Sequence, residues 1–236
     1  MNWLDSKTIK DFGGGLIVLF GLFDFSNHSS LFTSPISSIE KSQNQRYMNV
    51  TYENIESQKI IDCFETALEG YKKLHDYEIT LVQKKIRAST MQAQPILKIG
   101  SFLKGVKRYR IKLAYHVRDE EQLPIDGLDE KVLIGWFAHE LGHLMDYQQY
   151  SNFQMIRFGA KYLLSGKQRK IIEHNADYIA IAHGFHEEIL ATKKFILEHE
   201  LIEEDYKAKM IRYYLPEGEV LICSEDKKLM EPFLNL

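Results

Sequence analysis

Residues 129–148 read DEKVLIGWFAHELGHLMDYQ and decide how the middle of this chain folds. Asp129 precedes the apolar run and is a good N-cap, because its carboxylate can accept a hydrogen bond from a free amide of the first turn. The apolar residues surround most of the helix instead of forming one stripe, which is typical of a buried helix. The stretch therefore predicts a buried α-helix over 130–148.

Two histidines and a glutamate stand inside this helix. His139 and His143 are four residues apart, or about 40° around the helix, so both imidazoles leave the same face and can bind one zinc ion. Glu140 lies on the adjoining face, near enough to take a proton from a water molecule that the metal activates. The alternative is a buried helix whose two core histidines are satisfied by neighbouring polar groups.

A catalytic zinc needs three protein ligands and one open position. The metzincin pattern would require Gly at 146 and His at 149, but the chain has Asp146 and Gln149 there. The better candidates are Glu173 and Asp177, which share one face of the next predicted helix. Glu173 can ligate the metal and Asp177 can accept the free N–H of a ligand histidine. The alternative for this pair is a solvated acidic face.

Together, HELGH at 139–143 and EHNAD at 173–177 resemble the motifs of the gluzincin clan of zinc metallopeptidases. The E-x-x-A-D form is similar to that of the integral-membrane prenyl-protein and stress-induced zinc peptidases and of the minigluzincins. The resemblance covers about residues 105–185, and the membrane spans of the integral-membrane relatives are missing. It implies that His139, His143 and Glu173 are zinc ligands, Glu140 the base and Asp177 the support of a ligand histidine.

The resemblance implies two further features. Gluzincins place an edge strand before the HExxH helix, antiparallel to the bound peptide, and residues 107–116 match it in position and pattern. A downstream histidine or tyrosine usually stabilises the oxyanion, and no single residue stands out for this role. The candidates are Tyr178, His183, His186 and Tyr213. Helix-end capping or solvent exposure is the alternative for the two histidines.

The rest of the chain predicts an α+β fold: a small antiparallel or mixed sheet packed on the active-site helix, followed by a mostly helical C-terminal part, as in zincins. Apolar and charged residues alternate over 107–116, which is the pattern of a half-buried strand. The predicted elements are a helix over 52–75, strands over 77–87 and 107–116, and helices over 168–183, 186–199 and up to about 213. Gly184 and Pro216 are the expected stop signals.

The N-terminal part predicts a leader or anchor followed by a linker. Residues 12–23 (FGGGLIVLFGLF) form an uncharged run that spans only about 18 Å as a helix, which suits a signal peptide or a weak membrane anchor. Residues 26–42 contain seven serines and are typical of an exposed linker. We therefore expect a leader or anchor and linker over 1–46 and a single zincin-like metallopeptidase domain over 47–236. This favours an exported or membrane-tethered protein, whereas a buried 12–23 segment favours the cytoplasm.

Composition excludes several classes of protein. The chain has 236 residues, 44% of them hydrophobic, which excludes a disordered chain, and a formal net charge of −3, which gives no reason to expect affinity for nucleic acid. Two cysteines, Cys63 and Cys223, exclude a disulfide scaffold and a cysteine-rich metal cluster, and leave one bridge possible. Composition does not predict the oligomeric state.

One charge feature is local. Residues 79–118 contain ten lysines and arginines and no acidic residue. A solvated outer face of the sheet is the simpler interpretation, and binding of an acidic substrate or a nucleic acid is the alternative.

The sequence therefore predicts a zinc-dependent metallopeptidase with Zn²⁺ as its cofactor and a peptide or protein as its substrate. One alternative is a non-catalytic or regulatory zinc protein, against which Glu140 argues because a structural site needs no base. The other is a nucleic-acid-associated module that uses the basic stretch 84–118.

Overall fold

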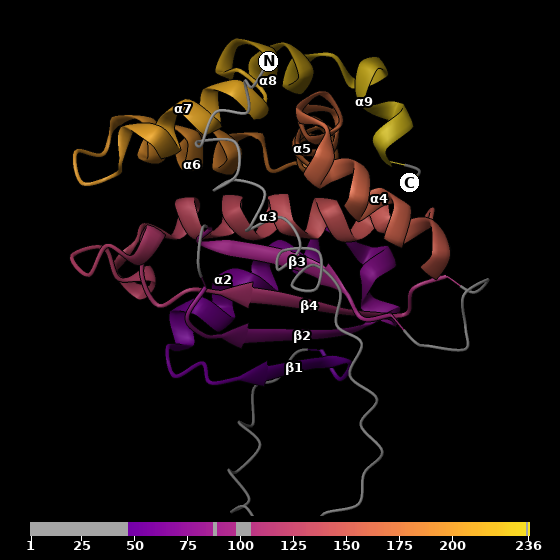
Figure 1. Cartoon of the computed structure of the whole chain (residues 1–236), viewed down its shortest axis with the longest axis horizontal. Coiled ribbons are helices and arrows are strands. Elements are labelled where there is room, and N and C mark those ends of the chain that lie inside the picture. The colour runs from indigo at the N-terminus through magenta and orange to yellow at the C-terminus, as the bar shows by residue number, and fades with distance from the viewer. Residues whose placement is uncertain (1–46, 87–88, 98–104, 235) are drawn as a thin grey trace, which may run out of the picture.

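The computed structural model describes residues 47–86, 89–97, 105–234 and 236. They form an α+β fold, which confirms the predicted class: a four-stranded sheet, a long helix beside it and a helical C-terminal half (Figure 1). The strands are β1 (Val50–Glu53), β2 (Glu78–Gln83), β3 (Met91–Pro95) and β4 (Arg108–Leu113). The helices are α2 (Gln58–Glu69), α3 (Glu130–Tyr147), α4 (Asn152–Leu164), α5 (Gly166–Ala182), α6 (His186–Glu198), α7 (Glu204–Tyr213), α8 (Glu217–Glu225) and α9 (Lys227–Leu234).

The sheet has the strand order β1-β2-β4-β3. Strands β1, β2 and β4 run parallel, and β3 pairs with β4 in the antiparallel direction. The expectation that residues 107–116 form the edge strand next to the HExxH helix is wrong, because β3 covers that side of β4. Strand β3 is the edge strand on this side of the sheet and packs against α3.

Alternation in β4 separates an apolar face of the sheet from a basic one. The side chains that face the core shared with α2 and α3 are Tyr109, Ile111 and Leu113. The side chains on the other face are Arg108, Arg110 and Lys112. The basic residues of β4 therefore point away from α3.

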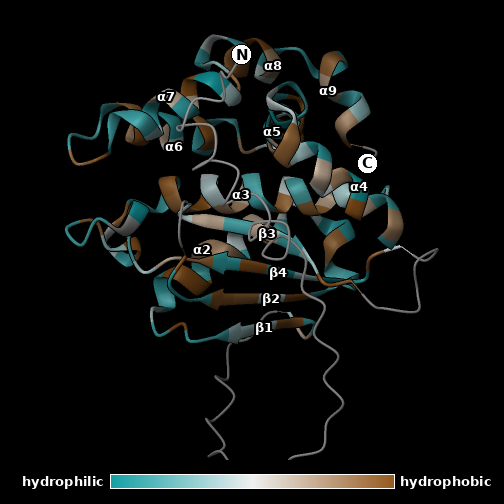
Figure 2. Cartoon of the chain, viewed as in Figure 1, coloured by the Kyte–Doolittle hydropathy of each residue, from teal (hydrophilic) through white to brown (hydrophobic). Residues whose placement is uncertain are grey.

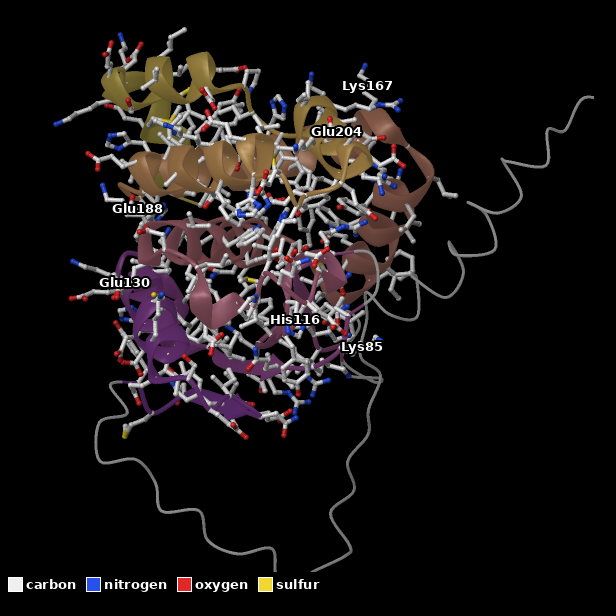
Figure 3. All side chains as sticks on the ribbon, turned by 90° about the vertical axis from the view of Figure 1, so that its left-hand side faces the viewer. Lys85, His116, Glu130, Lys167, Glu188 and Glu204 are labelled. Carbon is white, nitrogen blue, oxygen red and sulfur yellow. The ribbon has the colours of Figure 1, made fainter. Side chains whose placement is uncertain are left out.

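The same separation of apolar and polar residues is visible elsewhere in the chain. Figure 2 shows hydrophobic residues along much of β2 and hydrophilic residues over much of α7. Lys85 is exposed at the margin of the sheet layer (Figure 3).

Helix α3 is buried along almost its whole length, as its apolar pattern predicts. Asp129 is its N-cap and accepts a hydrogen bond from the first turn. Two glycines let other helices reach its backbone. A Cβ atom at Gly135 would lie 2.1 Å from the carbonyl oxygen of Glu188 in α6, and one at Gly142 would lie 2.6 Å from that of Ala176 in α5. No larger residue fits at either crossing, so α5 and α6 pack on α3 at backbone distance.

The predicted order of elements needs correction at several points. Residues 52–75 do not form one helix, because they contain the end of β1, helix α2 and a short 3-10 helix at Lys72–Asp76. Helix α4 was not predicted, although Ser151 and Gln154 form the capping box that begins it. Pro216 does not end the helical series, since it is the N-cap of α8.

Other expectations have mixed outcomes. Gly184 follows α5 with φ of +94°, a left-handed conformation that suits glycine, so this predicted stop is confirmed. Cys63 and Cys223 are buried and unpaired with each other. No helix in the described ranges is long and apolar enough to cross a membrane. The predicted leader at 12–23 and linker at 26–42 lie outside the described residues.

Candidate metal centre

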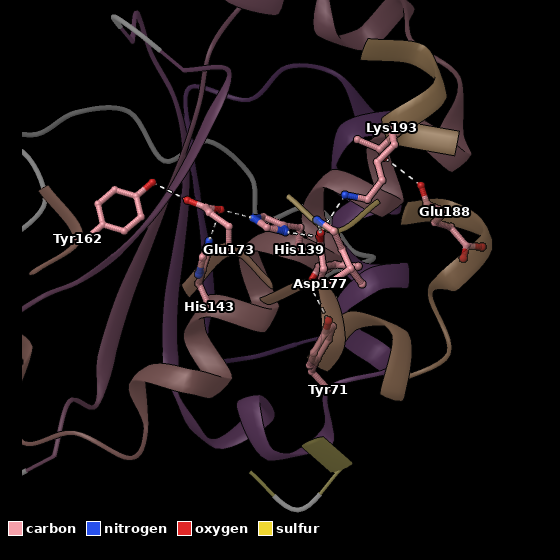
Figure 4. Close-up of polar contacts among 11 residues, drawn as sticks. Tyr71, His139, His143, Tyr162, Glu173, Asp177, Glu188 and Lys193 are labelled. Carbon is pink, nitrogen blue, oxygen red and sulfur yellow. Dashed lines mark hydrogen bonds and ion pairs between the residues drawn. The ribbon is translucent and has the colours of Figure 1, made fainter. Parts of the chain in front are cut away.

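Two histidines of α3 and one glutamate of α5 meet in the interior (Figure 4). Nε2 of His139 lies 3.1 Å from Oε2 of Glu173, and Nε2 of His143 lies 3.4 Å from the same oxygen. Two atoms that bind a tetrahedral zinc ion at about 2.05 Å lie about 3.3 Å apart. One ligand atom from each residue lies within 4.8 Å of the others, and all three residues are buried. His139, His143 and Glu173 could therefore hold a metal ion.

The close approach of α3 and α5 brings these residues together. His139 and His143 share one face of α3 because they are four residues apart. Gly142 between them lies against the backbone of Ala176 in α5, three residues after Glu173. Because glycine has no side chain to hold the two helices apart, the Glu173 carboxylate reaches both imidazoles.

Asp177 supports the first histidine from behind. Its Oδ1 atom lies 2.9 Å from Nδ1 of His139. Its Oδ2 atom accepts hydrogen bonds from Nζ of Lys193 at 2.8 Å and from the backbone N–H of Leu215 at 3.0 Å. In the neutral imidazole that a metal binds, a carboxylate at Nδ1 keeps the proton on that nitrogen and leaves the Nε2 lone pair for the metal, which is the arrangement predicted from the E-x-x-x-D spacing.

The electrostatics of the cluster favour a cation. Burial lowers the pKa of His139, but hydrogen bonds with Asp177 and Glu173 outweigh it and raise the pKa to about 10. Burial raises the pKa of Glu173, but hydrogen bonds from His139 and His143 hold it well below its usual range. The pKa of Asp177 is also lowered, because the charge of Lys193 and the His139 hydrogen bond outweigh burial. Two ionised carboxylates therefore surround His139 at neutral pH.

Glu140 lies beside the triad and is not one of its ligands. Its Oε2 atom accepts a hydrogen bond of 2.6 Å from the backbone N–H of Ala93 in β3. Burial raises the pKa of Glu140, and the charges of His143 and His139 offset only part of the rise. A carboxylate with a raised pKa accepts and returns a proton more readily near neutral pH.

The triad opens into a cavity of about 150 Å³ between β3, α3 and α4. A cavity of about this size can bind a molecule as large as benzene. Its charged or titratable lining consists of His139, Glu140, His143, Glu173 and three tyrosines. Its apolar lining includes Met91, Pro95, Met155 and Phe158. A small group of a bound molecule could therefore lie next to the candidate metal ligands.

Sequence reasoning missed three residues of the site. Tyr162 of α4 donates a hydrogen bond of 2.5 Å to Oε1 of Glu173. The ring of Tyr214 lines the cavity, with its centroid 5.3 Å from that of His139. Lys193 is paired with Asp177. The capping box at Ser151 could have revealed α4, but no local pattern marks Tyr214 or Lys193.

The expected candidates for oxyanion stabilisation lie elsewhere. None of Tyr178, His183, His186 and Tyr213 lines the described cavity. The hydroxyl of Tyr178 donates to Glu219, and Nδ1 of His183 lies 2.8 Å from the carbonyl oxygen of Ile179 at the end of α5. Helix-end capping is therefore the role of His183.

Comparisons with known proteins do not assign this chain. None of the family models, curated proteins or solved structures that were compared with it matches. The function of the site must therefore be derived from its own residues.

Proposed function

We propose that this chain is a zinc-dependent peptidase of the gluzincin type, which hydrolyses peptide bonds with water as the nucleophile. One observation carries the proposal: the buried triad of His139, His143 and Glu173 shares its cavity with a separate carboxylate, Glu140. A metal site that only stabilises a fold has no use for an adjacent base. The juxtaposition therefore favours a hydrolase over the alternative of a non-catalytic zinc protein.

The donor set suits zinc. Two imidazole nitrogens and one carboxylate oxygen are a common protein ligand set of catalytic zinc sites, which keep a fourth position open. The cavity adjoins all three residues, so the fourth position can face a substrate. When bound, the zinc ion supplies a Lewis acid that polarises a carbonyl oxygen and lowers the pKa of water.

Glu140 would act as the general base. It accepts the proton of the attacking water and then delivers it to the nitrogen of the leaving amine. The Ala93 N–H holds Oε2, which orients the carboxylate and leaves Oε1 for the water. Such a base contributes about 10²–10⁴-fold to the rate.

Strand β3 offers a binding edge for an extended peptide. Backbone hydrogen bonds of Thr90 and Ile96 join its two ends to β4. Because hydrogen bonding alternates along a strand, Met91, Ala93 and Pro95 turn their carbonyl groups to the free side, and these three residues line the cavity. The N–H of Ala93 on that side is already bonded to Glu140, and proline has no N–H. A peptide could add to this edge as a further strand. The substrate is therefore a peptide or a protein segment in an extended conformation.

Tyr214 would stabilise the oxyanion. Burial, reinforced by the nearby Glu173 carboxylate, raises its pKa well above the usual value, so the hydroxyl keeps its proton at neutral pH. A protonated hydroxyl on the wall of the cavity can donate a hydrogen bond to the oxygen that becomes negative in the transition state.

The test combines metal content with peptidase activity. Plasma mass spectrometry of the purified wild type should find one zinc per chain, and Glu173→Ala should lose most of it. A peptide library should be cleaved by the zinc-loaded wild type but not after chelation. A folded, zinc-supplemented wild type without zinc would overturn the proposal. A zinc-loaded protein that cleaves no peptide would leave the non-catalytic alternative in its place.

A further inference from the structure

Helix α6 places a buried lysine behind the metal centre. Lys193 is 4% exposed and is the only buried lysine or arginine among the described residues. Its Nζ atom lies 2.8 Å from Oδ2 of Asp177, whose Oδ1 atom is 2.9 Å from Nδ1 of His139 (Figure 4). The three side chains form a continuous row of polar contacts that ends at a candidate metal ligand.

The backbone of α6 determines where this lysine lies. Gly135 lets α6 approach α3 at the carbonyl of Glu188. The hydroxyl of Thr192 lies 2.9 Å from the carbonyl oxygen of Val132 and joins the same two helices. Lys193 follows Thr192 in α6. The close crossing of α3 and α6 therefore places its side chain within reach of Asp177. A buried ammonium is costly unless it is paired, so the pair with Asp177 is the contact that makes this position tolerable.

The same carboxylate holds the segment that carries Tyr214. Oδ2 of Asp177 accepts a hydrogen bond of 3.0 Å from the backbone N–H of Leu215. Nζ of Lys193 lies 5.4 Å from the centroid of the Tyr214 ring, within the range of a cation–π contact. Lys193 therefore contacts both Asp177 and the tyrosine that packs beside His139.

We propose that Lys193 is a positioning residue of the metal centre, which acts through Asp177. By pairing with Oδ2, Lys193 fixes the carboxylate and orients Oδ1 toward His139. Asp177 then presents Nε2 of His139 to the metal and anchors the Tyr214–Leu215 segment at the cavity. The inference rests on the proposed function only in taking His139 as a metal ligand. Loss of a residue that orients a metal ligand without touching the metal typically weakens metal affinity by about 10–100-fold.

The experiment is a double-mutant cycle on zinc affinity, measured by competition with a chromophoric chelator. Lys193→Met should weaken zinc binding by about tenfold or more. Lys194→Met, the same change at the exposed neighbour in α6, should leave the affinity unaltered. In the Asp177→Asn background, Lys193→Met should change the affinity by less than about twofold, because its partner is already neutral. Equal effects in both backgrounds, or no effect in the wild-type background, would overturn the inference.

Two additions keep the test independent of folding and of catalysis. The comparison of Asp177→Asn with the double variant does not require that the single variant Lys193→Met folds. A large difference in zinc affinity between those two proteins would also overturn the inference. The absorption spectrum of the cobalt-substituted protein should change with Lys193→Met and not with Lys194→Met, because it depends on ligand geometry. If the wild type binds zinc but cleaves no peptide, the proposed function is refuted, but the double-mutant cycle on zinc affinity still tests the role of Lys193. A wild type that binds no metal would refute both.

Discussion

Gly142 of α3 lies against the backbone of Ala176 in α5, so closely that a Cβ atom at Gly142 would be 2.6 Å from the Ala176 carbonyl oxygen. The contact lies between two candidate ligands, His139 and His143, and a third, Glu173. It sets the separation of the two helices that form the triad.

The substitution Gly142→Ala should therefore disturb both stability and metal binding. Overpacking of this kind costs about 1–3 kcal/mol, and the shift of α5 should move Glu173 away from the histidines. Denaturant unfolding and zinc titration measure the two effects. Gly218→Ala is the matched control, because a Cβ atom at Gly218 in α8 meets nothing within 4 Å. That control should be neutral or stabilising by up to about 1 kcal/mol. Equal stability of the two variants would contradict the helix-spacing role.

Glu140→Gln should separate metal binding from catalysis. The amide cannot accept the proton of water, so turnover should fall by about 10²–10⁴-fold while one zinc per chain is retained. Peptide cleavage rates and metal content are the measurements. Glu130→Gln, at an exposed position in the first turn of the same helix, should leave both unaltered. Unchanged turnover in Glu140→Gln would remove this residue as the base.

Tyr162→Phe should weaken metal binding without unfolding the protein. The hydroxyl of Tyr162 holds Oε1 of Glu173 and leaves Oε2 directed at the histidines. Its removal frees the carboxylate to rotate, and zinc affinity should fall by about tenfold. Tyr178→Phe removes a comparable hydrogen bond, to Glu219, away from the cavity and should not change the affinity. If the two variants bind zinc equally well, Tyr162 does not orient the ligand.

Tyr214→Phe should lower kcat with little effect on KM. A donor to the oxyanion acts mainly in the transition state, and its loss typically costs about 10²–10³-fold in kcat. Steady-state kinetics on a peptide substrate would measure it, with Tyr213→Phe as the neighbouring control. A loss confined to KM would mean that Tyr214 binds substrate and does not stabilise the transition state.

Zinc affinity should rise with pH across the neutral range. The pKa of His139 is raised to about 10 in the metal-free protein, so at pH 7 its Nε2 carries a proton that the metal must displace. Glu173, whose pKa is lowered, is already ionised and adds no pH dependence there. Each unit of pH between 6 and 8.5 should therefore tighten binding by about tenfold, and the gain should end above the His139 pKa. Chelator competition at several pH values measures this slope. A flat profile would show that His139 is neutral before the metal binds.

Local patterns were enough for the central helix and for the two motifs. The Asp129 cap and the apolar run predicted α3 to within a residue. Spacings of four residues placed His139 beside His143 and Glu173 near Asp177, because both pairs lie within single helices of known geometry. The class of fold followed from the alternation over 107–116 and the helical periods around it.

Short or weakly patterned elements were missed. Strand β3 is five residues long, with sequence MQAQP, and lacks the β-branched and aromatic residues that usually mark a strand. Its position at the edge, in place of β4, depends on pairing with residues 14 to 22 positions away. Helix α8 follows Pro216, its N-cap, and proline is common at the start of a helix as well as after its end.

The sequence by itself determined the candidate ligands, the candidate base and the supporting aspartate, because His139, Glu140 and His143 share one helix and Glu173 and Asp177 share another. Only the tertiary structure decided which partners complete the site. Tyr162, Lys193 and Tyr214 reach it from α4, α6 and the segment after α7. Contacts between helices arise from packing at crossings such as those at Gly135 and Gly142. The residues that meet at a crossing are far apart in the sequence, so the periodicity of each helix does not predict which side chains touch.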